Sequence, residues 1–193
     1  MKPIQISSAN FLKVSLVALL ALAIAGFFYF ENSLILRMLV VVLGLISLWQ
    51  INSIDEIILL LTLYLSFYDL YNIHYWRGIP IAIIILAVLL ITILLFYAQT
   101  TFSKAKEIIE KDIFKVYSLV IGLSIIELFL AMDLWPVDPR TKSLVLAIIF
   151  FLISKTIYLY ANSMLSFKRM VGFIVVSVLI LGIIVILSFF QGF

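Results

Sequence analysis

The sequence predicts an all-α fold, a polytopic bundle of about seven membrane-spanning helices. Apolar residues make up 66% of the 193-residue chain and charged residues only 12%, whereas a soluble domain has about 45–50% and about 25%. Most of the length falls into apolar runs that can cross about 30 Å of hydrocarbon as helices. No run alternates as a transmembrane β-strand would. We therefore expect a single integral membrane domain over residues 1–193.

The apolar runs and the turn signals between them set the expected helices. The first run contains Ala23-Ile24-Ala25, small residues typical of a signal-peptide cleavage site, so a retained helix and a cleaved signal both stay open. Asp138 precedes Pro139, the order of an N-cap and a first helical residue. The predicted helices cover residues 11–30, 33–50, 55–72, 80–98, 114–135, 139–161 and 170–190.

A long polar connection, residues 101–113, separates the fourth and fifth predicted helices. Phe102, Ala105 and Ile109 share one helical face, and charged residues fill the others, which indicates an amphipathic helix at the membrane surface or an extension of the next helix. Its charged face is either solvated or a docking surface. If the chain has seven membrane-spanning helices, eight basic residues fall on one side of the membrane and four on the other. The positive-inside rule then predicts that the N-terminus and this connection lie in the cytoplasm and that the C-terminus lies outside. The larger set is Lys2, Lys13, Lys104, Lys106, Lys111, Lys115, Lys168 and Arg169, and the smaller is Arg37, Arg77, Arg140 and Lys142.

Two ionisable residues, Glu127 and Lys155, lie inside predicted membrane-spanning segments. Each costs at least about 2.5–3.5 kcal/mol at membrane depth, which makes both candidates for ion or proton binding. Glu127 lies about 12 Å from Trp135 along the helix, so we expect it to be neutral, paired, or beside a water-filled cavity. Lys155 either extends its ammonium group to the inner interface or pairs with Glu127.

Polar and aromatic residues gather at the predicted outer end. Tyr64, Tyr68, Tyr71 and Tyr75 recur on one helical face. They indicate an aromatic belt with a polar interfacial loop, or a tyrosine-lined vestibule for a solute. The orientation places this region and the turn after Trp135 on the same side. The outer-face candidates are Tyr68, Asp69, His74, Asp133, Trp135 and Asp138.

The composition excludes several kinds of chemistry. The chain has no cysteine and one histidine, so disulfides, Cys-ligated zinc or iron–sulfur sites and histidine metal clusters are excluded, and we expect no metal and no cofactor. No phosphate-binding G-x-x-x-x-G-K-[ST], H-E-x-x-H or G-x-S-x-G pattern is present. A net charge of +3 favours contact with anionic lipid headgroups over nucleic acid.

These observations favour a non-enzymatic protein of a bacterial plasma membrane, a scaffold, assembly or regulatory subunit of a membrane complex. Its expected partners are membrane lipids and either another membrane protein or further copies of itself. The alternative is a small transporter or channel that uses Glu127 to bind a proton or cation, and an intramembrane enzyme comes third. A transporter should have a polar cavity that reaches Glu127, whereas a scaffold should have a packed bundle with an apolar partner surface.

Overall fold

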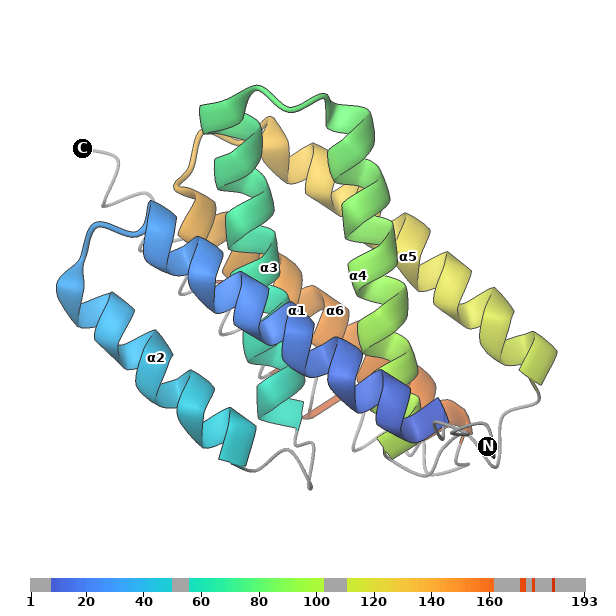
Figure 1. The fold of residues 1–193 in the computed structure, drawn as a ribbon. Coiled ribbons are helices and arrows are strands. Elements are labelled where there is room, and N and C mark those ends of the chain that lie inside the picture. The colour runs from blue at the N-terminus through green and yellow to red at the C-terminus, as the bar shows by residue number, and fades with distance from the viewer. Residues whose placement is uncertain are drawn as a thin grey trace, which may run out of the picture.

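The computed structural model describes residues 8–49, 56–102 and 111–161, together with Val171, Gly172, Val175 and Gly182. The predicted all-α class is confirmed for these ranges, which form six helices and contain no strand. Four helices, α1, α3, α4 and α5, are long and apolar enough to span a membrane. The bounds are α1 Ser8–Phe30, α2 Leu34–Trp49, α3 Glu56–Arg77, α4 Ile81–Phe102, α5 Lys111–Asp133 and α6 Pro139–Ala161 (Figure 1).

Two predicted segments fall largely outside the described residues. Of the connection 101–113, the structure describes the two residues that end α4 and the three that begin α5. Of the predicted helix 170–190, it describes four single positions. The helix count of seven and the orientation therefore stay predictions.

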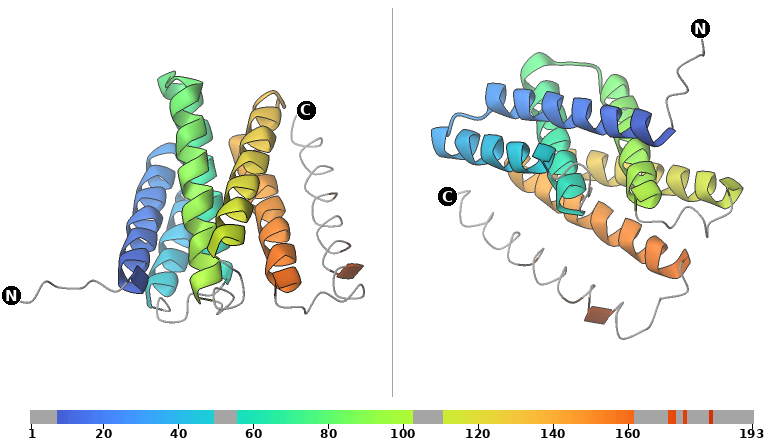
Figure 2. Two further views of the ribbon diagram at one scale, coloured as in Figure 1. Left: turned by 90° about the vertical axis from the view of Figure 1, so that its right-hand side faces the viewer. Right: turned by 60° about the horizontal axis from the view of Figure 1, so that its bottom comes forward.

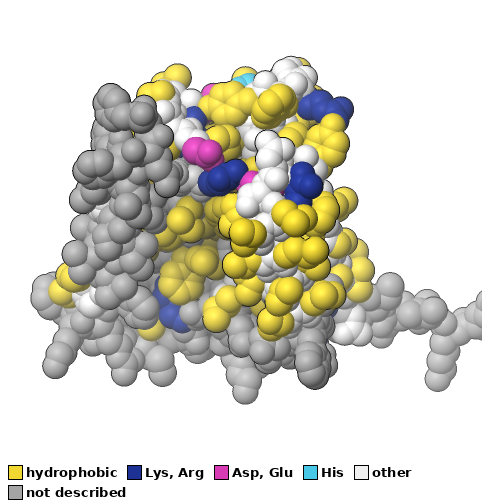
Figure 3. Space-filling model, turned by 90° about the vertical axis from the view of Figure 1, so that its left-hand side faces the viewer, with side chains coloured by type: hydrophobic (Ala, Val, Ile, Leu, Met, Phe, Trp, Pro, Cys, Tyr) yellow, Lys and Arg dark blue, Asp and Glu magenta, His cyan; other side chains and the backbone are white. Residues whose placement is uncertain are grey.

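Successive helices run in opposite directions, so three tight turns meet at one end of the bundle (Figures 1 and 2). We call this the polar end; it contains residues 31–33, 78–80 and 134–138. The apolar lengths of the helices lie below it. Figure 3 shows charged side chains gathered at this end above a largely apolar surface.

Helix α3 is the central element. It packs against α1, α4 and α6, while α5 packs against α4 and α6. Of its apolar span 61% is buried, against 28–33% for the spans of α1, α4 and α5. Leu63, Phe67 and Tyr71 have no exposed surface. Because neighbours surround α3, its polar side chains lie inside the bundle.

Helix α3 also extends five residues beyond the predicted end at residue 72. Gly78 ends it in the left-handed region at φ 58°, a conformation that glycine adopts without steric cost. The Gly78 amide donates to the carbonyl of His74 at 3.2 Å. His74, which lies beyond the predicted end of this helix, is therefore held on α3.

Candidate functional site

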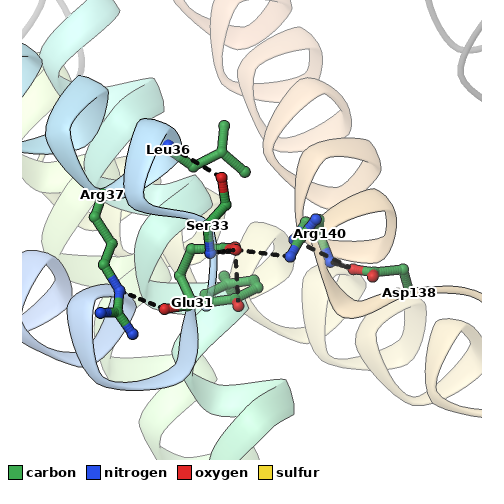
Figure 4. A network of polar contacts seen from close by, with 7 residues as sticks. Glu31, Ser33, Leu36, Arg37, Asp138 and Arg140 are labelled. Atoms are coloured by element: carbon green, nitrogen blue, oxygen red, sulfur yellow. Dashed lines mark hydrogen bonds and ion pairs between the residues drawn. The ribbon is translucent and has the colours of Figure 1, made fainter.

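The most connected polar residue at the polar end is Glu31, in the turn between α1 and α2. Its side chain has no exposed surface. Oε1 accepts hydrogen bonds from Arg140 Nη2 at 2.8 Å and from the Ser33 amide at 2.9 Å. Oε2 accepts a longer one, 3.4 Å, from the Tyr68 hydroxyl. Figure 4 shows Glu31 with its partners Ser33 and Arg140. The turns before α2 and before α6 are thus joined to the central helix through one carboxylate.

Local capping positions Glu31. Ser33 caps α2, because its carbonyl accepts from the Arg37 amide at 3.0 Å and its hydroxyl from the Leu36 amide at 3.5 Å. The Arg37 side chain turns back to donate to the Glu31 carbonyl and lies over the Phe28 ring at 5.2 Å. The sequence did not single out Glu31 as a candidate, because its partner Arg140 lies 109 residues away.

A second cluster joins α3, α5 and α6 around Lys142. This lysine is 2% exposed, and its Nζ donates to the Tyr75 hydroxyl at 2.7 Å and to the Asp133 carbonyl at 3.2 Å. Nζ also lies 5.5 Å and 5.0 Å from the ring centroids of Tyr71 and Tyr75. The aromatic faces and carbonyl dipoles compensate a buried ammonium group.

The outer-face candidates His74 and Asp133 come together in this cluster. His74 Nε2 lies 3.7 Å from Asp133 Oδ2, and His74 Nδ1 lies 3.2 Å from the Ile79 carbonyl oxygen. The Tyr75 hydroxyl donates to the Asp133 carbonyl at 3.1 Å. The end of α3 and the end of α5 therefore meet in space. Within the described ranges, no group of three or more His, Cys, Asp or Glu residues is placed to hold a metal ion.

The prediction that Asp138 is the N-cap of α6 is confirmed. Its Oδ1 accepts from the Arg140 amide at 2.7 Å, and its carbonyl accepts from the Thr141 amide at 3.0 Å. The carboxylate is exposed and lies 4.0 Å from Arg140 Nε. Trp135, the neighbouring candidate, is half-buried in the turn before it.

The candidates Tyr68 and Asp69 are buried, 3% and 7% exposed, because they lie on the central helix. Tyr68 packs against Phe27 with ring centroids 4.9 Å apart. The Asp69 carboxylate lies against Gly26 of α1, so closely that a Cβ atom at position 26 would overlap it. Asp69 Oδ1 and Ser66 Oγ are buried without a hydrogen-bond partner.

The structure separates Glu127 from Lys155. Glu127 lies six residues before the end of α5, and Lys155 lies sixteen residues after the start of α6. Since both helices descend from the same turn, the two residues differ by about 15 Å in depth at 1.5 Å per residue. Glu127 is exposed on the outward side of α5, and Lys155 is half-buried. The hypothesis of an inward Glu127–Lys155 pair does not fit this arrangement.

No known protein family, curated protein or solved structure matches this chain. The function must therefore be argued from the geometry of the described residues.

Proposed function

We propose that this protein is an assembly subunit of a membrane complex, and that α5 binds a transmembrane helix of its partner. The outward face of α5 carries Val116, Leu119, Leu123 and Glu127, all exposed. Their spacing of three and four residues places them in one stripe along the helix. The opposite side of α5 packs into the bundle through buried residues such as Ile125 and Phe129.

This proposal depends on the exposed position of Glu127 on α5. It lies within the apolar span Lys115–Asp133, about 9 Å from the Asp133 end. A short carboxylate at that depth cannot reach the interface as a lysine can, and its exposure to hydrocarbon is costly. A partner helix that donates a hydrogen bond to Glu127 would remove that cost.

The need of the Glu127 carboxylate for a hydrogen-bond donor defines the partner helix. We expect a transmembrane helix with a lysine, arginine, asparagine or glutamine at the depth of Glu127 and small or apolar residues around it. A second copy fits less well, since a two-fold contact along this stripe brings the same surface of both copies together. Two Glu127 carboxylates would then lie close in a low dielectric, where like charges repel.

The same geometry weighs against Glu127 as a transport residue. The transporter alternative expects a polar cavity at Glu127. The larger of the described cavities is instead lined by residues of α1, of α3 and of the turn before α4, and Glu127 is not among them. An outward position on a packed bundle favours association over conduction.

Site-specific photo-crosslinking in native membranes tests the proposal. A photoreactive residue at position 123, one turn from Glu127, should crosslink to the transmembrane segment of one other protein, and that segment should contain a lysine, arginine, asparagine or glutamine. The product should be lost in Glu127→Leu, and a photoreactive residue at Met38, on the exposed side of α2, should not give it.

Two outcomes would contradict this function: adducts with lipid alone, or a crosslink between two copies of the chain. Glu127→Leu should leave the unfolding transition in detergent unchanged or raise it, because the side chain has no role in packing the bundle. That measurement separates a lost interface from a misfolded protein.

A further inference from the structure

An open cavity of about 340 Å³ lies between the end of α1 and the last turns of α3 at the polar end. This volume falls within the range of about 300–1,000 Å³ that small-molecule sites occupy. Its wall combines a cation, a phenol hydroxyl and apolar side chains, and none of the described lining residues carries a carboxylate. These residues are Gly26, Tyr29, Phe30, Ile73, Arg77 and Ile79.

The polar part of the cavity consists of hydrogen-bond donors around Arg77. This residue is exposed; its Nη2 donates to the Tyr29 hydroxyl at 3.1 Å, and its guanidinium lies 5.6 Å from the Tyr29 ring centroid. Among the described residues, no carboxylate forms an ion pair with Arg77. A guanidinium has five N–H donors, and the Tyr29 hydroxyl keeps its own O–H donor. The polar part of the cavity therefore fits an anion.

The apolar part of the cavity extends from Arg77 toward the apolar length of the bundle. Ile73 precedes Arg77 by four residues, so it lies on the same face of α3, about 6 Å deeper along the helix. Gly26 lies at the same spacing before Phe30 on α1 and leaves room because it has no side chain. Phe30, Ile73 and Ile79 are half-buried. An inorganic anion would leave their apolar surface uncovered, whereas an anion with an attached hydrocarbon chain would cover it.

Arg77 also lies where lipid headgroups are expected. It is the last residue of the apolar span Ile57–Arg77. The side chains of the neighbouring Trp76 and of Tyr29 are 79% and 67% exposed. Exposed tryptophan and tyrosine side chains are typical of the membrane–water interface, at the level of the headgroups. A phospholipid in the membrane can therefore bring its phosphate to Arg77 while its acyl chains stay in the hydrocarbon.

We infer that this cavity binds one anionic phospholipid, with its phosphate on Arg77 and the start of an acyl chain against the apolar lining residues. A guanidinium binds two phosphate oxygens at once, through parallel N–H donors. A headgroup that carries an ammonium would bring a second cation close to Arg77, and the described lining offers it no carboxylate. The headgroup is therefore one without a positive charge. The site lies on α1 and α3, so it is independent of the proposed role of α5.

Ligand-induced stabilisation of the purified protein in a neutral detergent tests the inference, because a ligand that binds the folded state raises Tm. The probes are dihexanoyl phosphatidylglycerol, dihexanoyl phosphatidylcholine and glycerol phosphate, which separate the headgroup charge from the acyl chains. Wild type should bind the phosphatidylglycerol at least about tenfold more tightly than either other probe, the size of one charge-assisted hydrogen bond. Equal binding of the two lipids would overturn the inference. Equally tight binding of glycerol phosphate would also overturn it, because the ligand would then be a free phosphate.

Arg77→Gln should remove the preference for phosphatidylglycerol over phosphatidylcholine. Arg37→Gln is the matched control: it removes the same charge at the polar end, from a residue outside the described lining, and should keep the preference. Ile79→Trp, which fills the apolar part and leaves Arg77 in place, should weaken phosphatidylglycerol binding. Each shift is measured from the variant's own Tm without lipid, so that lower stability is not read as lost binding. A preference that survives in Arg77→Gln, or that Arg37→Gln removes as well, would contradict the inference, as would unchanged affinity in Ile79→Trp.

Discussion

At the scale of single residues, Glu31 and Asp138 show how position decides what a carboxylate does. Both lie in turns at the polar end, and both contact Arg140. Glu31 is fully buried and accepts from three donors, whereas Asp138 is half exposed and fills a backbone cap. The Arg140 side chain itself is 45% exposed, so water keeps part of its charge solvated. Removing the Glu31 charge should therefore cost more than removing that of Asp138.

We predict that Glu31→Gln lowers the free energy of unfolding by about 1.5–3 kcal/mol, the range for a hydrogen bond to a charged group. The glutamine amide presents donors where Arg140 and the Ser33 amide also donate. Asp138→Asn, as the control, should change the same quantity by less than about 1 kcal/mol, as expected for an exposed ion pair. Unfolding in mixed detergent, followed by circular dichroism, gives both values. Equal losses would mean that Glu31 is not the hub of this network.

The Asp138 side chain caps α6, so we expect its removal to lower the stability of the protein. Asp138→Ala removes the acceptor of the Arg140 amide and should lower the free energy of unfolding by about 0.5–2 kcal/mol. Asparagine keeps an oxygen at that position and should cap nearly as well. The two variants are compared by the same unfolding measurement. A larger loss from asparagine than from alanine would show that the negative charge, and not the cap, matters.

At the scale of helices, glycines set how closely neighbours approach. Gly26 lies against Asp69 of α3, Gly44 against Ile24 of α1, and Gly122 against Leu89 of α4. Membrane helices gain little from the hydrophobic effect when they associate, so close packing at small residues contributes a large share of their attraction. The α1–α3 contact differs from the other two because the neighbour of its glycine is a carboxylate.

Gly26→Ala should separate α1 from α3, because the added methyl overlaps the Asp69 carboxylate. We expect a loss of about 1–3 kcal/mol, as for overpacking of a filled interior. Gly172→Ala is the matched control, since a Cβ there meets no atom within 4 Å. Thermal unfolding in detergent compares the two variants. A Gly26→Ala protein as stable as wild type would mean that Asp69 can leave this contact at little cost.

At the scale of the whole molecule, the polar end contains the ion pairs His74–Asp133, Glu31–Arg140 and Asp138–Arg140 and three tight turns of the described residues. The predicted orientation places this end outside the cell. The same orientation predicts that the lysine-rich connection faces the cytoplasm, as the count of basic residues indicates. The predicted excess of basic residues on the cytoplasmic side is opposed by three arginines at the polar end, Arg37, Arg77 and Arg140. Two of them, Arg37 and Arg140, are held by Glu31.

Reporter fusions test the orientation. A fusion after Ser103 should show cytoplasmic activity, and a fusion at Phe193 should show the activity of the outer side. A tag inserted into the turn 134–138 of the full-length protein gives a third position and should report the outer side. If the fusions after Ser103 and at Phe193 report the same side, either the count of seven helices or the retained first helix is wrong.

Local patterns determined most of the architecture. Long apolar runs predicted helices that the structure places within a few residues of the expected bounds for α1 to α6. Asp138 before Pro139 predicted a cap because capping needs only neighbours in sequence. The end of α3 was placed too early because the polar residues after residue 72 suggested a loop, while their tertiary partners keep them helical.

Only the tertiary structure decided which faces look inward and which distant residues meet. In a membrane, both the interior and the lipid-facing surfaces of a helix are apolar, so hydrophobic periodicity cannot tell one from the other. For this reason the sequence left open whether Glu127 points into the bundle, and it did not mark α3 as central. Glu31 meets Arg140 across 109 residues, and Lys142 meets Tyr75 across 67. Such pairs depend on which helices are neighbours, and packing between helices sets that arrangement.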